Sequence, residues 1–141
     1  MSLFSRTPKD PLSPGEWRIM RIVWRLKECA ARDVYTEAGE EHGWSVSTVK
    51  TMLRRLVEKG YLKAKPVGNS FLYRPAKSAI ASLTKAADTL LENALEGTTG
   101  PLLAHMVKKS ELSNEEVQEL RALLDQHESN ARENQAEEPS P

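Results

Sequence analysis

Apolar residues recur with the spacing of an amphipathic helix between residues 45 and 60, and the rest of the chain can be interpreted around this stretch. Four of them follow the i, i+3, i+4, i+7 pattern: Val49, Met52, Leu53 and Leu56. Ser45 is a typical N-cap, and Gly60 is typical of a helix end. The opposite face is polar and carries Ser47, Thr51, Arg54 and Glu58. The pattern therefore predicts a helix with one buried and one exposed face.

Two further helices are predicted before this one. Ser13-Pro14-Gly15-Glu16 has the form of a capping box with proline at the first helical position, which starts a helix that runs to about Leu26. A short break at 27–30, with the character of a small strand, leads to a second helix over about 31–41. The second helix, a compact turn at 42–44 and the helix at 45–60 form a predicted helix-turn-helix.

After Gly60 the hydrophobic period changes from helical to alternating. The segments 61–66 and 70–75 alternate, and Val67-Gly68-Asn69 between them offers turn residues, so we predict a β-hairpin. Pro66 lacks an amide donor and must lie at a sheet edge or in the loop. A helix-turn-helix followed directly by a hairpin is a winged helix. We therefore predict a winged-helix domain over 12–77 with its wing at about 61–75.

The second half of the chain, 78–128, shows three short amphipathic helices without a large core of their own. Such helices bury their apolar faces most readily against a second copy, so we interpret this region as a dimerisation element; the alternative is that they fold back on the winged helix. Pro101 is the expected N1 residue of the middle helix. The predicted interface residues are Leu83, Leu90, Leu91, Leu102, Leu103, Met106, Val117, Leu120 and Leu124.

The expected fold class is thus mainly α with a small β-hairpin wing, a winged helix-turn-helix followed by a helical dimerisation region. The polar ends of the chain, 1–11 and 129–141, are expected to be a disordered arm and a disordered acidic tail.

Charge divides the chain although the net charge is zero. Residues 1–77 hold 15 Lys and Arg against 8 Asp and Glu, whereas residues 78–141 hold 5 against 12. A basic half indicates contact with a polyanion, and a helix with hydroxyl and basic residues on one face suits the major groove of double-stranded DNA. The alternative is a protein-interaction module that uses the same helix without reading DNA sequence.

Candidate DNA contacts follow from this interpretation. For base edges we select Ser47, Thr48, Lys50 and Thr51. For the DNA backbone, or for mixed contacts, we select Arg54, Arg55, Lys63, Lys65 and Arg74.

No catalytic, metal-binding or cofactor motif is recognisable, so we expect neither an enzyme nor a cofactor. His42, His105 and His127 do not fall at metal-ligand spacing with Cys29, the single cysteine. Cys29 is expected to be a buried residue, with a redox switch as the alternative. Neither a signal peptide nor a membrane-spanning segment is evident, so we expect a cytoplasmic protein.

Several motifs carry a family resemblance over most of residues 12–125. They are Leu12-Ser13-Pro14-Gly15-Glu16-Trp17, Trp44-Ser45, Thr48-Val49-Lys50-Thr51, Tyr73-Arg74-Pro75 and Leu102-Leu103-Ala104-His105. In these stretches the chain resembles the penicillinase-repressor family, which includes methicillin-resistance and copper-responsive bacterial repressors.

This resemblance implies a homodimeric winged-helix repressor that binds a palindromic operator, often with TACA/TGTA-type half-sites. It also implies a membrane sensor protease as a partner, which triggers cleavage of penicillinase-branch repressors at an Asn-Phe bond. The corresponding pair here is His105-Met106, and the C-terminal cysteine cluster of the copper branch has no counterpart. Two further departures are Asn69, where arginine is common, and Val46, where proline is frequent.

Overall fold

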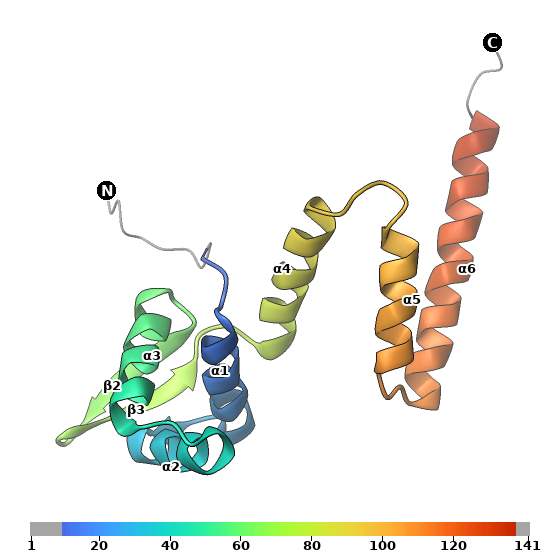
Figure 1. The fold of residues 1–141 in the computed structure, drawn as a ribbon. Helices are drawn as coiled ribbons and strands as arrows, with labels where there is room; N and C mark the ends of the chain where they lie inside the picture. Colours follow the sequence, from blue (N-terminus) through green and yellow to red (C-terminus); the bar gives the residue numbers. More distant parts are fainter. Residues whose placement is uncertain (1–9, 138–141) are drawn as a thin grey trace, which may run out of the picture. The chain divides into compact units, whose positions relative to one another are not determined.

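The computed structural model describes residues 10–137, which form two compact units that divide between Glu92 and Asn93 (Figure 1). The first unit contains α1 (Pro14–Leu26), β1 (Cys29–Ala30), α2 (Ala31–His42), α3 (Val46–Glu58), β2 (Leu62–Val67), β3 (Ser70–Pro75) and α4 (Ala79–Glu92). The second contains α5 (Thr99–Lys109) and α6 (Asn114–Glu137). The mainly helical class with a small antiparallel sheet is confirmed.

The core of the first unit lies where α1, α2 and α3 pack against one another. Each helix contributes the apolar stripe that its sequence predicts, because residues three and four apart share one helix face. The central side chains, each buried to 1% exposure or less, are Ile19, Met20, Ile22, Val23, Val34, Ala38, Val49, Leu53 and Leu56. This core holds α3 from one side and leaves its other side facing solvent.

The sheet has the strand order β1-β3-β2, with both pairs antiparallel. Cys29 lies opposite Tyr73, which confirms the small strand expected at 27–30. Strands β2 and β3 pair from Leu62 with Pro75 to Val67 with Ser70, and Gly68, at φ +62°, opens the two-residue turn between them. Pro66 lies in an edge strand as its missing donor requires. The predicted wing is therefore present.

Local hydrogen bonds and backbone conformation fix the start of α1 and both ends of α3. At α1, the Ser13 backbone N–H donates to Glu16 Oε1 at 2.8 Å and the Glu16 N–H donates to Ser13 Oγ at 3.2 Å, which is the predicted capping box. At α3, the Thr48 N–H donates to Ser45 Oγ at 3.3 Å. Gly60, at φ +86°, takes the left-handed conformation that ends the helix region and turns the chain into β2.

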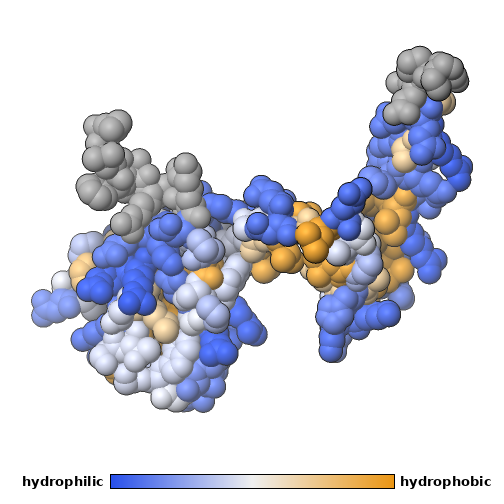
Figure 2. All heavy atoms as spheres, turned by 45° about the horizontal axis from the view of Figure 1, so that its top comes forward, coloured by the Kyte–Doolittle hydropathy of each residue, from blue (hydrophilic) through white to orange (hydrophobic). Residues whose placement is uncertain are grey.

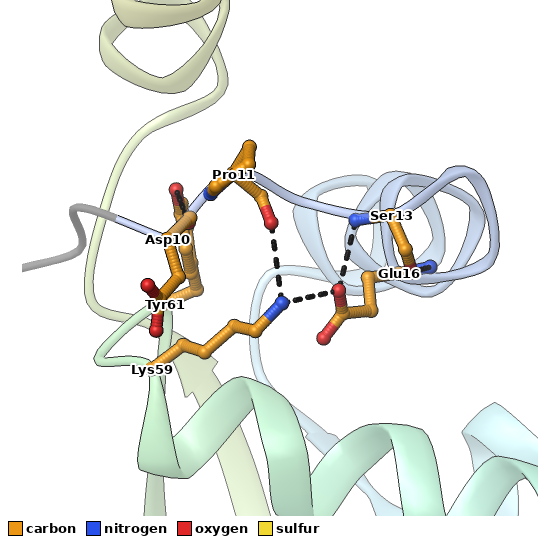
Figure 3. Close-up of polar contacts among 6 residues, drawn as sticks. All are labelled: Asp10, Pro11, Ser13, Glu16, Lys59 and Tyr61. Atoms are coloured by element: carbon orange, nitrogen blue, oxygen red, sulfur yellow. Dashed lines mark hydrogen bonds and ion pairs between the residues drawn. The ribbon is translucent and has the colours of Figure 1, made fainter.

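The start of the described chain is held in place by hydrogen bonds (Figure 3). Lys59 Nζ donates to the Pro11 carbonyl at 3.2 Å, and the Tyr61 hydroxyl donates to the Asp10 carbonyl at 3.2 Å. A disordered arm was expected over 1–11, but Asp10 and Pro11 are ordered. Their carbonyls accept hydrogen bonds from Tyr61 and Lys59 of the first unit. The remainder of that prediction, 1–9, lies outside the described residues.

The predicted dimerisation region, 78–128, does not form one unit. Its first helix, α4, belongs to the first unit, where Ser82 is buried and Trp24 Nε1 donates to the Lys77 carbonyl at 2.9 Å. The predicted helix start at Pro101 is also displaced, since α5 begins at Thr99. Proline remains tolerated there because the N–H groups of the first turn have no intrahelical acceptor.

Helix α6 begins at the expected capping box, where the Ser113 N–H donates to Glu116 Oε1 at 3.2 Å and the Glu116 N–H donates to Ser113 Oγ at 3.1 Å. It then continues to Glu137, so the residues after 128 extend the helix and differ from the disordered tail expected from 129. Residues 114–137 contain no glycine or proline, and an i,i+4 pair joins Arg132 to Glu128 at 2.6 Å. These features favour continuation of the helix.

Candidate nucleic-acid interface

Helix α3 presents a polar face that lies opposite its buried face. Ser47, Thr48, Lys50, Arg54 and Arg55 are exposed, and Thr51 is half-buried. The buried stripe of the same helix faces the core of the first unit. The base-contact candidates from the sequence therefore lie together at one surface, and their contact with DNA stays a prediction.

Hydroxyl groups at the beginning of α3 are oriented by one another. Ser45 Oγ lies 2.9 Å from Thr48 Oγ1 and 3.2 Å from Ser47 Oγ. The Thr51 hydroxyl donates to the Ser47 carbonyl at 3.0 Å. Thr51 thus uses its donor within the helix and keeps its oxygen lone pairs and its methyl group for an external partner. A threonine methyl suits apolar contact with the methyl group of thymine.

Arg54 makes only a weak contact within the helix. Its Nε lies 3.9 Å from Glu58 Oε1, and both side chains are mostly exposed. Exposed pairs of this kind contribute little because water screens them. Arg54 is therefore available to an anion at little energetic cost.

A hollow of about 720 Å³ lies between α3, the beginning of α2 and the wing. Lys50 enters its lining from α3, Arg32 from α2, and Asn69, Ser70 and Phe71 from the wing. Phe71 is 48% exposed, and its ring centre lies 6.5 Å from that of Tyr73. The hollow offers two cations, hydroxyl and amide groups and an aromatic surface, the chemistry that meets phosphate and sugar. It also contains one carboxylate, that of Asp33, which accepts a hydrogen bond from the Ala30 N–H at 3.0 Å.

The sequence predictions missed Arg32, Ser70 and Phe71 as members of this surface. They come from separate segments, so no local spacing connects them to Lys50. The one signal was the basic character of residues 1–77, which does not say which cation faces which surface.

The predicted basic residues of the wing lie on its other face. Lys63 pairs with Arg74 across the strands and Lys65 pairs with Leu72, whereas Phe71 and Tyr73 occupy the alternate positions. Because side chains alternate between the two faces of a sheet, Lys63, Lys65 and Arg74 face away from the hollow that Lys50 lines. They line a second hollow with Val57 and Glu28. The structure thus separates the basic residues into two sets, one on each side of the wing.

The C-terminal end of α3 is fixed to α1 by a buried ion pair (Figure 3). Lys59 Nζ lies 2.6 Å from Glu16 Oε1, and the Glu16 side chain is 2% exposed. Burial raises the pKa of Glu16, but hydrogen bonds from Lys59 and Ser13 and the charge of Lys59 outweigh it, so the pKa lies below its ordinary value of 4.5. Glu16 is therefore ionised at neutral pH, and the pair positions the polar face of α3.

Cys29 lies in β1 with 3% exposure. Burial, together with the charges of Asp33 and Glu28, raises the pKa of its thiol to about 11. The thiol is protonated at neutral pH, and a protonated, buried thiol reacts slowly with oxidants. This environment disfavours the redox switch that the sequence left as an alternative.

Large apolar side chains remain exposed on the last three helices, as the orange areas of Figure 2 show. Of the predicted interface residues, seven have exposures between 39% and 65%, namely Leu83, Leu90, Leu91, Leu103, Met106, Leu120 and Leu124. Leu102 and Val117 are half-buried. Large apolar side chains that remain exposed in this number on neighbouring helices are typical of a surface that binds a partner.

Other classes of site are not evident in the part of the chain that the structure describes. Within 10–137, His, Cys, Asp and Glu side chains do not gather in a group of three that could hold a metal ion. The same residues include no helix with the length and apolar character needed to cross a membrane.

Comparison with known proteins adds the family. The family model for the penicillinase repressor matches residues 12–126. An uncharacterised 16.5 kDa protein of Latilactobacillus sakei is 32% identical over 115 residues, which cover 82% of this chain and 79% of that protein. The methicillin resistance regulatory protein MecI of Mammaliicoccus sciuri is 28% identical over 113 residues, which cover 80% of this chain and 92% of MecI.

Among solved structures, the DNA-binding domain of the repressor BlaI is 30% identical and has a TM-score of 0.47, with coverage of 51% of this chain and 85% of that one. Because the family model spans most of the sequence, the resemblance noted in the sequence is confirmed. The chain belongs to the penicillinase-repressor family of winged-helix, DNA-binding transcriptional repressors.

Proposed function

We propose that this protein represses transcription as a homodimer that binds a palindromic operator, with α3 in the major groove of each half-site. One observation carries the proposal: α3 has a polar face of hydroxyl and basic residues directly opposite a fully buried stripe. A helix held rigidly on one side can present the other side to base edges. The relatives named for penicillinase and methicillin resistance agree with a repressor.

Ser47, Thr48, Lys50 and Thr51 contact base edges in this proposal, and Arg54 and Arg55 contact bases or phosphates. The hollow beside Lys50 receives one stretch of DNA backbone, with Arg32 as an added phosphate contact. Lys63, Lys65 and Arg74 approach backbone from the other face of the wing. Phosphate contacts fix the register of the protein on DNA, while the α3 side chains supply the sequence preference.

A second copy covers the exposed apolar faces of α4, α5 and α6. Burial of such side chains is favourable by about 25 cal/mol for each Å² removed from water. Two copies related by a two-fold axis match a palindrome with half-sites about one helical turn apart.

The proposed function does not include release by a membrane sensor protease. The pair His105-Met106 stands where the resemblance places the Asn-Phe cleavage bond, and both residues lie inside α5. A protease binds its substrate in extended form, so a bond within a helix requires local unwinding before cleavage.

The test begins with selection of the preferred duplex from random sequence by the purified full-length chain. Binding to this duplex and to a scrambled one is then measured at about 50 and 200 mM salt, a range over which neutralisation of six or more phosphates weakens affinity about 10³-fold or more. Thr51→Ala removes one methyl contact and should reduce the preference for the selected sequence by about 1 kcal/mol, whereas Lys63→Gln should weaken both duplexes alike.

Lys109→Gln is the matched control, because it removes one charge from α5, outside the proposed DNA-binding surface. Equal losses on both duplexes for Thr51→Ala would contradict base contact by α3. The protein-interaction module would instead be supported if no preferred DNA sequence is selected and the chain binds a protein partner with an affinity that salt does not weaken.

A further inference from the structure

A cleft of about 180 Å³ lies between α4 and the segment that leads into α1, within the first unit. Leu12 and Trp17 line it from the beginning of α1, Tyr61 from the start of the wing, and Ser82, Lys85 and Ala86 from α4. None of these residues belongs to the proposed DNA-binding surface.

The floor of the cleft is mainly apolar, and the hydroxyl groups of Tyr61 and Ser82 in it are already paired. Leu12, Tyr61 and Ser82 are buried. The Tyr61 hydroxyl donates to the Asp10 carbonyl, and the Ser82 hydroxyl donates to the Ser78 carbonyl at 3.0 Å. A ligand that reaches the floor therefore meets carbon atoms and the ring of Trp17.

The rim carries one cationic group, the ammonium of Lys85. The ion pairs found among the described residues join other side chains and do not include Lys85. An exposed lysine beside an apolar cleft can pair with an anionic group of an occupant while the rest of the occupant stays out of water.

Size and charge together define the occupant. A dry apolar cavity of about 150 Å³ can hold benzene, so 180 Å³ accommodates one six-membered ring with a small substituent. We propose that this cleft binds a small aromatic monocarboxylate, with the ring against Leu12, Trp17 and Tyr61 and the carboxylate beside Lys85.

Such a ligand contacts α4 on one side and the body of the winged helix on the other. Ser82 is the buried residue of α4, and the hydrogen bond from Trp24 holds the Lys77 carbonyl, two residues before this helix begins. Occupation of the cleft adds contacts that restrain α4, the helix that connects the first unit to α5 and α6. The binding site itself does not depend on the proposed repressor function.

The test uses benzoate and the neutral, nearly isosteric benzamide with the purified full-length chain. The readout is the indole N–H resonance of Trp17 in two-dimensional NMR spectra. The signal of Trp44 is the internal reference, because the ring centre of Trp24 lies only 6.0 Å from that of Trp17. We expect a saturable shift of the Trp17 signal by benzoate and at least tenfold weaker binding of benzamide.

Two variants separate charge from shape. Lys85→Gln should remove the preference for benzoate over benzamide, and Ala86→Leu, which fills the cleft from α4 with a good helix former, should abolish the response to both. Lys108→Gln, a change of equal charge on α5, should bind benzoate like the unchanged chain. Thermal unfolding of each variant is recorded so that loss of folding is recognised.

Three results would overturn the proposal: no saturable Trp17 shift, equal binding of the two probes, or an unchanged response in Ala86→Leu. Binding of benzoate only after removal of residues 1–9 would also overturn it, since that result would identify this segment, and not a small ligand, as the occupant of the cleft. DNA affinity does not enter any of these measurements, so failure here is distinguishable from failure of the repressor proposal.

Discussion

The ion pair between Glu16 and Lys59 allows a quantitative test of how the DNA-binding helix is held. Glu16 lies in the first turn of α1 and Lys59 caps the end of α3. Their 2.6 Å contact is almost completely withdrawn from water, with side-chain exposures of 2% and 20%. Glu16→Gln keeps the size of the side chain and removes its charge.

The expected cost follows from the surroundings of the two carboxylate oxygens. Oε1 receives the Lys59 ammonium and the Ser13 N–H, and hydrogen bonds to charged groups contribute about 1.5–3 kcal/mol each. Oε2 is buried without a hydrogen-bond partner in the described structure, so an amide group placed there would leave its donors unpaired. Lys59 keeps the Pro11 carbonyl, which limits the loss. We expect a decrease of about 2–3 kcal/mol in the free energy of unfolding.

The assay is urea unfolding followed by tryptophan fluorescence, because Trp17, Trp24 and Trp44 all lie in the first unit. Lys59→Met should cost more, about 3–5 kcal/mol, since it leaves a buried carboxylate without its cation. The double variant should lose less than the sum of the two single losses. Glu58→Gln, which breaks an exposed pair on the same helix, should change the stability by less than about 0.5 kcal/mol.

The pH dependence of the free energy of unfolding provides an independent test of the ion pair. Because the folded-state pKa of Glu16 lies below its ordinary value of 4.5, the ionised pair stabilises the protein fully above that pH, and this contribution is lost as pH falls through the folded-state pKa. The stability difference between the unchanged chain and Glu16→Gln should therefore shrink below pH 4.5. Two results would refute this reasoning. One is that Glu16→Gln and Lys59→Met each lose no more free energy of unfolding than Glu58→Gln, with losses that simply add in the double variant. The other is a stability difference between the unchanged chain and Glu16→Gln that grows on acidification.

Two further predictions concern the thiol and the apolar faces. The pKa of about 11 and the 3% exposure of Cys29 predict that a disulfide reagent at pH 8 labels it only after unfolding; rapid labelling of the native protein would contradict this. Leu124→Asp, at a site 65% exposed on α6, should convert a dimer to monomers in analytical ultracentrifugation while the fluorescence unfolding midpoint of the first unit is kept. Gln126→Asp, which adds the same charge two residues further along α6, should remain dimeric, and dimers of both variants would argue against this face as the interface.

Sequence alone was sufficient for the elements that depend on local chemistry. The cap at Ser13, the turn at Gly68 and the apolar stripe of α3 each depend on residues within a few positions, so spacing identifies them. The same local reasoning placed the start of α5 two residues late and did not predict α6 beyond 128. Helix ends respond to small differences in free energy, and the expected tail rested on the polar composition after 128, although the first proline beyond that point is Pro139.

Only the tertiary structure decided which distant residues share a surface. It placed Arg32 and Ser70 beside Lys50, and it turned Lys63 and Arg74 to the other face of the wing. The Glu16–Lys59 pair and the cleft beneath α4 likewise join segments that are far apart in the chain. Periodicity says which side of an element is buried, but the neighbour that covers it depends on the packing of the whole unit, which no local pattern encodes.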